Sequence, residues 1–439
     1  MLLWARGRAL RLHRGADAAG SQHQLFGATG GRQRHFSHRR ADRAGRPPSR
    51  DLLTRRRGGG VSERSLAASL ILATCAAVAT AEACPFCGAV GQPLASRRDA
   101  AAGVAVGEAD GPASLQPDGG MTQPFLLRQR LAGKAALPET MTATVASPVR
   151  GTAAVFIGRS GAEESRTAAA IAADETRLGY LATAPAVEQP AAKRLRWFAR
   201  WLEHPDPVVA EDAFAEFGQA PFAAVREAAD ALPAARLRDW VADPGISQQR
   251  RGFYGLALGL VAAADPDERE ACRQALWQVI EQPADDFRAG FDGILAGVLV
   301  ADGEAGLEAL MARGLLEPAA RPVEKRQMLA VLRFAWESLG DAIPRDRLAQ
   351  ATARLLESPV TAAEATIDLA RYRWWDATDR VAALWSELGN DDPLVRRAVA
   401  GYLIACPEPQ ARQHEAALRR RDPVRFEQAA QAAALPLGR

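Results

Sequence analysis

The sequence predicts a mostly α-helical chain, in which successive helix pairs stack side by side as an α-solenoid. A small antiparallel β domain and a disordered N-terminal head precede the helices. Three observations predict this fold. From Ala191 onward, Pro, Gly or Asp interrupts apolar helical patterns about every ten to eighteen residues. Residues 100–185 contain short apolar runs between Gly, Pro and Asp clusters, as strands do. The first sixty residues lack any apolar period. We therefore expect a head at 1–60, a signal peptide at 62–83, a β domain at 84–185 and helical repeats at 191–434.

The head carries the basic charge of the chain. Residues 1–60 hold fourteen Arg, no Lys and three Asp, a net charge of +11, whereas the whole chain has +3, so the remainder carries −8. A segment of this composition cannot bury a core and is expected to be disordered. Alternatively, translation starts at Val61 and the head is not made. Because phosphate backbones would repel the acidic remainder, we expect no nucleic-acid partner.

An apolar run at Leu66–Ala79 has the features of an export signal. It is shorter than the ~20 residues that span a bilayer, and two overlapping A-x-A cleavage sites lie within Ala79–Ala83. The sequence therefore predicts a mature chain that starts at Glu82 or Cys84 and is periplasmic or secreted. Membrane attachment is expected only if Cys84 is acylated.

The motif Cys84-Pro85-Phe86-Cys87 follows the signal. Its spacing suits a redox dithiol, half of a zinc site or a local disulfide. No His follows Cys87 and no second C-x-x-C pair exists, which argues against haem attachment and zinc. A thioredoxin-like motif should open a helix after a strand, whereas this motif opens the mature chain. We favour a local disulfide, with thiol–disulfide catalysis as the alternative.

Short apolar runs in residues 100–185 predict a small antiparallel sheet or barrel. The Ala- and Glu-rich stretch 161–175 is compatible with a loop or a helix. The predicted strands are Ala102–Val106, Phe125–Arg130, Met141–Ala146 and Ala153–Ile157.

The clearest helix signal begins at Asp391. Asp391 or Asp392 can serve as the N-cap and Pro393 fits the first helical position, after which apolar residues from Val395 to Cys406 fall on one face. A weaker copy stands at Asp206–Phe217, 186 residues earlier, which at about 40 residues per unit gives four to five repeats. Other predicted helices are Leu195–Leu202, Phe253–Ala262, Ala271–Ile280, Phe287–Val300, Leu307–Leu316, Val323–Leu339, Arg345–Leu356, Ala362–Tyr372 and Val381–Leu388.

Several motifs occur in a characteristic order: Cys84–Cys87, Trp201–Asp206, Asp212–Gly218, Arg250–Gly255, Asp368–Tyr372, the D-P-x-V-R-x-A pattern from Asp392 and Tyr402–Pro407. This order resembles a group of uncharacterised secreted bacterial HEAT-like repeat proteins. The resemblance implies a small OB-like β domain, similar to netrin-type inhibitor domains, in front of HEAT-like repeats, and it implies no activity. Ala210 and Glu211 replace the usual Arg of the signature, so an Asp–Arg ladder is not expected at that unit.

No catalytic or metal constellation is evident in the sequence. After the signal only His204 and His414 remain, more than 200 residues apart. Neither stands beside a nucleophile in sequence, and neither H-E-x-x-H nor a P-loop is present. We therefore expect no enzyme, no cofactor and no metal.

One surface candidate remains, the cluster Arg371, Tyr372, Arg373, Trp374 and Trp375. Adjacent tryptophans at a helix end fill a gap between repeats or anchor a partner, since Trp, Tyr and Arg dominate binding hot spots. The sequence thus favours an exported scaffold that binds a protein or peptide on a concave helical face. The alternative is a periplasmic thiol–disulfide oxidoreductase that uses Cys84 and Cys87, and a third hypothesis is a structural envelope module without a discrete ligand.

Overall fold

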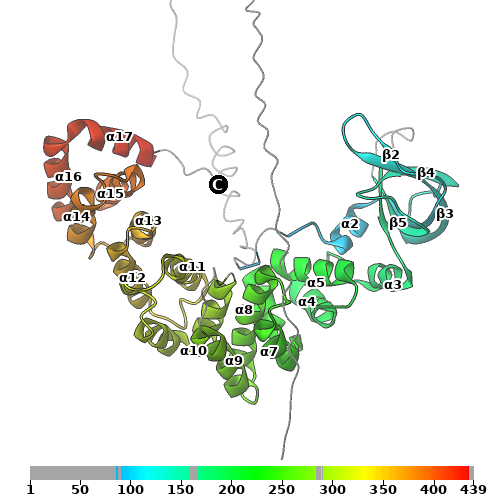
Figure 1. Cartoon of the computed structure of the whole chain (residues 1–439), viewed down its shortest axis with the longest axis horizontal. Helices are drawn as coiled ribbons and strands as arrows, with labels where there is room; N and C mark the ends of the chain where they lie inside the picture. The colour runs from blue at the N-terminus through cyan, green and yellow to red at the C-terminus, as the bar shows by residue number, and fades with distance from the viewer. Residues whose placement is uncertain (1–85, 88–89, 159–166, 283–287, 289, 435–439) are drawn as a thin grey trace, which may run out of the picture. The chain divides into compact units, whose positions relative to one another are not determined.

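Helices dominate the fold, and one small mixed sheet precedes most of them (Figure 1). The computed structural model describes residues 86–87, 90–158, 167–282, 288 and 290–434. The predicted head at 1–60, the signal peptide at 62–83 and Cys84 lie outside these residues. All described residues belong to one compact unit, Val78–Arg439. Within them, no helix has both the length and the apolar character that a membrane span requires.

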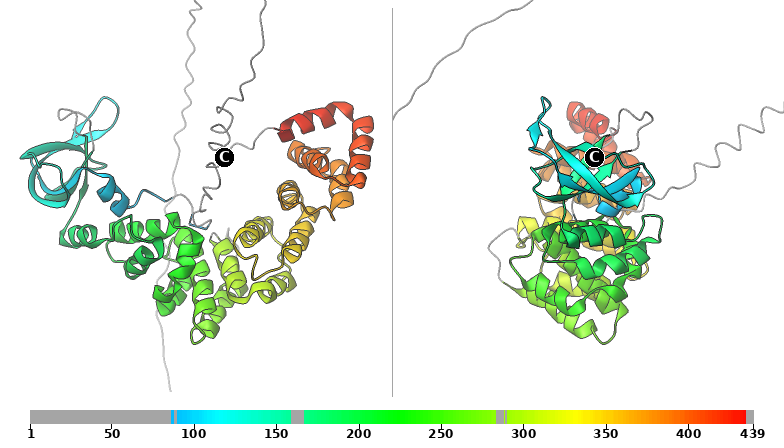
Figure 2. Two further views of the ribbon diagram at one scale, coloured as in Figure 1. Left: turned by 180° about the vertical axis from the view of Figure 1, so that it is seen from behind. Right: turned by 90° about the vertical axis from the view of Figure 1, so that its right-hand side faces the viewer.

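The strands form a closed sheet. Its order is β1-β5-β6-β4-β3-β2, and β1 also pairs with β3, so the sheet closes on itself, as the views in Figure 2 show. The prediction of a purely antiparallel sheet was wrong in one pairing, because β4 and β6 run parallel at Thr144 and Ala169. The strands are β1 (Gly103–Ala109), β2 (Ser114–Leu115), β3 (Met121–Gly133), β4 (Thr140–Thr144), β5 (Thr152–Ile157) and β6 (Ala168–Ala172).

Small and large apolar residues together fill the interior of this barrel. Phe125 and Val155 are fully buried there, and a Cβ added to Gly107 would lie 2.9 Å from the Val155 side chain. All four predicted strands lie largely within β1, β3, β4 and β5. The stretch 161–175, expected to be loop or helix, contains strand β6. An alanine-rich run forms a strand here because it pairs in register with buried β5.

The helical part begins with short helices and continues in longer ones. The predicted helices Phe287–Val300 and Leu307–Leu316 correspond to the two parts of α10, which are separated by non-helical backbone at Gly303 with φ 58°. Phe287 lies outside the described residues. The helices are α2 (Leu94–Ala100), α3 (Glu175–Thr183), α4 (Ala191–Phe198), α5 (Pro207–Gln219), α6 (Phe222–Glu227), α7 (Ala234–Ala242), α8 (Gln248–Ala264), α9 (Arg269–Glu281), α10 (Phe291–Ala312), α11 (Pro322–Ser338), α12 (Arg345–Arg354), α13 (Ala362–Tyr372), α14 (Thr378–Glu387), α15 (Pro393–Ala405), α16 (Pro409–Arg421) and α17 (Pro423–Ala434).

Both predicted Asp-Pro signatures start helices as expected. Asp392 caps α15, since its carboxylate accepts the N–H of Leu394 at 2.7 Å. Asp206 caps α5 in the same way through Val208 at 2.9 Å. Of the two predicted candidates, Asp392 rather than Asp391 is therefore the N-cap, and a proline without an N–H follows it at no cost in hydrogen bonds.

Helices α8 and α10 pack with their backbones in contact. A Cβ added to Gly259 would lie 2.2 Å from the carbonyl oxygen of Gly297, and one added to Gly293 would lie 2.0 Å from that of Gly252. Only glycine fits at such a crossing. The contact is formed by two copies of one pattern, G-F-x-G-x-x-x-G, which begin at Gly252 and Gly290.

Candidate functional site

Phe86 and Cys87, the two described residues of the predicted Cys motif, lie against the helices. The Phe86 ring packs edge to face on Phe334 with centroids 5.1 Å apart, and Gln249 donates a hydrogen bond to the Cys87 carbonyl. Cys87 is fully buried and disulfide-bonded. Cys272 and Cys406 are free thiols, and Cys84 lies outside the described residues. The Cys87 sulfur is therefore shielded from solvent.

The five residues of the predicted surface cluster separate in space. Arg371 lines one pocket, whereas Arg373, Trp374 and Trp375 line another. Tyr372 faces neither, and its ring stacks on that of Trp336 with centroids 3.8 Å apart and planes inclined by 16°. The five residues therefore do not line one of these two pockets together.

The end of α13 explains this separation. Arg373 has φ 55°, the left-handed conformation that ends many helices. The next N–H, that of Trp374, donates to the Leu369 carbonyl at 3.0 Å. After this turn, Trp374 and Trp375 line a different pocket from the one that Arg371 lines.

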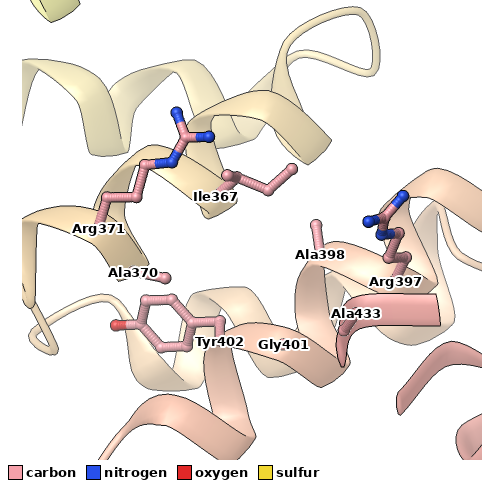
Figure 3. Close-up of a pocket in the computed structure, with 8 residues that line it drawn as sticks. All are labelled: Ile367, Ala370, Arg371, Arg397, Ala398, Gly401, Tyr402 and Ala433. Atoms are coloured by element: carbon pink, nitrogen blue, oxygen red, sulfur yellow. The ribbon is translucent and has the colours of Figure 1, made fainter. Parts of the chain in front are cut away.

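The first pocket lies between helices α13, α15 and α17 and encloses about 340 Å³. Two guanidinium groups, from Arg371 and Arg397, stand at its two sides, with Ile367 and Ala398 between them (Figure 3). We call it the arginine pocket. Its residues are Ile367, Ala370, Arg371, Arg397, Ala398, Gly401, Tyr402 and Ala433.

A buried carboxylate lies near the Arg371 guanidinium. Asp368 is 1% exposed; it accepts a hydrogen bond from Arg333 Nε at 2.6 Å and lies 3.6 Å from Arg371 Nη1. Burial raises the pKa of Asp368, and the two guanidinium groups oppose that rise. The Arg371 side chain is 63% exposed. Arg371 thus contacts this carboxylate through one nitrogen while most of its side chain faces solvent.

Tyr402 separates the two pockets. Its ring lines the arginine pocket and meets Trp375 edge to face at 5.0 Å, and its hydroxyl donates to the Trp374 carbonyl at 2.8 Å. Burial raises the pKa of Tyr402 to about 12, so the hydroxyl remains a donor. This link fixes the wall between the pockets.

The second pocket, the tryptophan groove, encloses about 550 Å³ and is acidic. Four carboxylates line it against one guanidinium, that of Arg373. One of them, Asp379, is 2.7 Å from His414 Nε2. The residues of the groove are Asp346, Gln350, Arg373, Trp374, Trp375, Asp376, Asp379, Glu408 and Gln410.

No family model matches this chain, and no curated protein or solved structure matches it.

A buried polar cluster between α3, α4 and α5 was missed by the sequence. Asp212 accepts hydrogen bonds from the Tyr180 hydroxyl at 2.7 Å and from the Leu94 N–H at 2.5 Å. Glu216 pairs with Arg194, and burial raises the pKa of Glu216 to about 7. Leu94 is 118 residues from Asp212, so no local pattern signals this contact.

The histidines are engaged separately. His204 Nδ1 accepts the N–H of Asp206 at 3.1 Å, and its ring packs on Trp201. His414 contacts Asp379, as described above. Among the residues that the structure describes, no group of three or more His, Cys, Asp or Glu side chains is arranged to hold a metal ion.

Proposed function

We propose that this chain is an exported protein–protein interaction scaffold, built on HEAT-like helical repeats behind an OB-like β domain. The arginine pocket is the observation that carries this proposal. It spans three helices that pack one after the other, α13 on α15 and α15 on α17. Arginine beside apolar surface is typical of binding hot spots.

Contacts at a regular sequence distance support the repeat architecture. In an α-solenoid each unit touches only its neighbours, so contacts should recur at about one repeat length. Three ion pairs between helices join residues 35 to 39 positions apart: Arg250–Glu211, Arg333–Asp368 and Arg347–Glu308. Arg354 on α12 also pairs with Glu317, 37 positions earlier in the segment between α10 and α11. The Arg250 pair also places an acidic residue, Glu211, where the HEAT signature usually has arginine.

The strand order supports the OB-like assignment. When β1, β3, β4, β5 and β6 are counted as strands one to five, they pair in the order 1-2-3-5-4-1. That order belongs to the five-stranded OB barrel. Strand β2 is a short addition that pairs with β3 only.

Export is the part of the proposal that comes from the sequence. The run Leu66–Ala79 predicts a signal peptide, and the disulfide at Cys87 suits an oxidising compartment. We further propose Cys84 as the partner of Cys87. The parts of the proposal that concern the fold and the pockets do not depend on export.

Site-specific photocrosslinking in intact cells tests the scaffold. A photoreactive p-benzoylphenylalanine at Ile367, inside the arginine pocket, is expected to give a discrete crosslinked band. The same group at Gln413, an exposed position on α16, serves as the control. Identical band patterns from both positions, or none from either at full expression, would count against a scaffold that uses this pocket.

A further inference from the structure

We propose that the tryptophan groove binds a basic peptide segment that contains arginine. A guanidinium of the peptide packs on the indole of Trp374, within reach of the carboxylates that line the groove. This site is separate from the arginine pocket that carries the proposed function, so the inference adds a second binding surface to the scaffold.

The tryptophan groove carries an excess of negative charge. Its lining holds four carboxylates and one guanidinium, that of Arg373. Asp379 is already paired with a histidine. Asp346, Asp376 and Glu408 are exposed, and neither they nor Arg373 form an ion pair or a side-chain hydrogen bond with any residue that the structure describes. The groove therefore presents three carboxylates that no direct contact neutralises, which favours a cationic ligand.

The two tryptophans give the groove an aromatic surface. Trp374 and Trp375 are both half-buried. Trp375 meets Tyr402 edge to face, whereas the ring of Trp374 contacts no aromatic ring and no guanidinium within the described part of the chain. An indole face attracts a cation, and the planar guanidinium of arginine also stacks on it, which the ammonium of lysine cannot do. Aromatic surface beside free carboxylates therefore favours arginine.

The chain itself pairs arginine with tryptophan elsewhere. The guanidinium carbon lies 4.6 to 5.1 Å from the indole centroid in three pairs of described residues: Arg200–Trp197, Arg236–Trp240 and Arg345–Trp336. At Trp374 no arginine of the described chain occupies this position. An arginine from a partner can take it.

The lining residues are distributed over several helices. Asp346 and Gln350 belong to α12, Asp379 to α14 and Gln410 to α16, and α14 packs on α16. Among the described residues, no three His, Cys, Asp or Glu side chains are arranged to hold a metal ion, so the carboxylates are too dispersed to share one small cation. A volume of about 550 Å³ over three helices suits an extended segment with several side chains.

Fluorescence polarisation with the full chain provides the test. The probes are three fluorescein-labelled peptides that share the frame Gly-Ser-X-Ala-Ser-X-Gly, with X as arginine, lysine or citrulline, an uncharged analogue of arginine. We expect the arginine peptide to bind about tenfold more tightly than the citrulline peptide, with the lysine peptide between them, and its affinity to fall as salt is raised. Equal binding of the arginine and citrulline peptides would overturn the inference.

Matched variants locate the binding site. Asp376→Asn is expected to weaken binding of the arginine peptide about threefold, and Trp374→Leu about fivefold. Arg373→Gln removes the guanidinium of the lining and should tighten binding about threefold. Asp391→Asn removes the same charge as Asp376→Asn at an exposed position beyond the other end of α14, and should leave binding unchanged. Circular dichroism and thermal unfolding establish that each variant is folded.

Three results would contradict the inference. Equal losses in Asp376→Asn and Asp391→Asn would mean that the peptide responds to the overall charge of the protein. Tighter binding of the lysine peptide than of the arginine peptide would exclude stacking on the indole. Displacement of the arginine peptide by spermidine, at a lower concentration than by the unlabelled arginine peptide, would assign the groove to a free polyamine.

The scaffold proposal can fail separately from this inference. Failure of the arginine peptide to bind, while Ile367 in the arginine pocket still crosslinks to a protein, would remove the basic ligand and keep the scaffold. Binding of the arginine peptide without that crosslink would support the groove and count against a scaffold that uses the arginine pocket.

Discussion

Glu216 is a single buried carboxyl whose protonation should affect the stability of the whole helical part. It is 5% exposed, and its neighbours from three helices are Arg194 on α4, Asp212 on α5 and Arg98 on α2. Burial raises its pKa from the ordinary 4.5 to about 7, and the charge of Asp212 adds to the rise. Folding therefore favours the protonated form.

The pH dependence follows from that direction. Because the folded pKa lies above the unfolded one, the stabilising contribution of Glu216 is complete below about pH 4.5 and is lost as the pH rises through about 7. The parent protein should lose unfolding free energy between pH 5 and pH 8. In Glu216→Gln, which mimics the protonated acid, we expect this loss to be smaller by about 1–3 kcal/mol. Urea unfolding at both pH values measures it.

Glu227 supplies the control for this experiment. It lies on α6, its side chain is 70% exposed, and Glu227→Gln should leave the pH profile of the parent intact. If Glu216→Gln and the parent lose the same free energy between the two pH values, the carboxyl is already ionised in the folded protein.

Single residues were predictable where their partners are close in sequence. The Asp392 cap could be inferred because its acceptor and donor are two positions apart. The position of Arg371 apart from Trp374 could not, because it depends on the left-handed backbone of Arg373. That conformation is uncommon for a residue with a side chain, and no sequence pattern at this position signals it.

At the scale of elements, the contact between α8 and α10 is the closest approach of two helices that we describe. Gly259→Ala would place a methyl group 2.2 Å from the Gly297 carbonyl oxygen and 2.6 Å from its Cα. Backbone atoms cannot move aside without separating the helices. We expect a loss of about 2–4 kcal/mol in unfolding free energy, measured by urea denaturation.

The matched substitution is Gly179→Ala in helix α3. A Cβ at Gly179 would have no heavy atom within 4 Å, so alanine should leave stability unchanged or raise it by up to about 1 kcal/mol. A similar effect from both substitutions would show that helix propensity, and not the close crossing, sets the cost at Gly259.

Most helices and strands could be predicted from the sequence alone. Strand β6 and the close contact between α8 and α10 were not predicted. Four apolar runs predicted four of the strands, and helix Ala362–Tyr372 has the predicted bounds. Strand β6 was not predicted, because its alanines form a strand only through their pairing with β5. The sequence did contain a signal for the α8–α10 contact, because the same glycine spacing occurs twice, beginning at Gly252 and at Gly290.

For the molecule as a whole, composition and the spacing of Pro, Gly and Asp predicted a mostly helical chain with a small β domain. The structure confirms this prediction. The solenoid and the scaffold function remain proposals, because stacking depends on contacts between helices that no single pattern encodes. The pockets also arise only when three or more helices meet, so the sequence could name Arg371 but not Arg397 or Tyr402 beside it.

The thiol–disulfide alternative can be tested on the whole protein. Cys87 is fully buried and disulfide-bonded, and exchange requires access to a sulfur. We expect the wild type and Cys84→Ser to reduce insulin at the same background rate in a turbidity assay with dithiothreitol, beside thioredoxin as the positive control. Acceleration by the wild type alone would make this protein an oxidoreductase.

The burial of Cys87 also has a consequence for how the protein matures. A Cβ on Gly218 would lie 3.3 Å from the Cys87 Cβ, so α5 closes directly over this cysteine. An oxidant that introduces the bond has to reach the Cys87 sulfur before α5 packs in place. We therefore expect the covalent link to form before this helix docks.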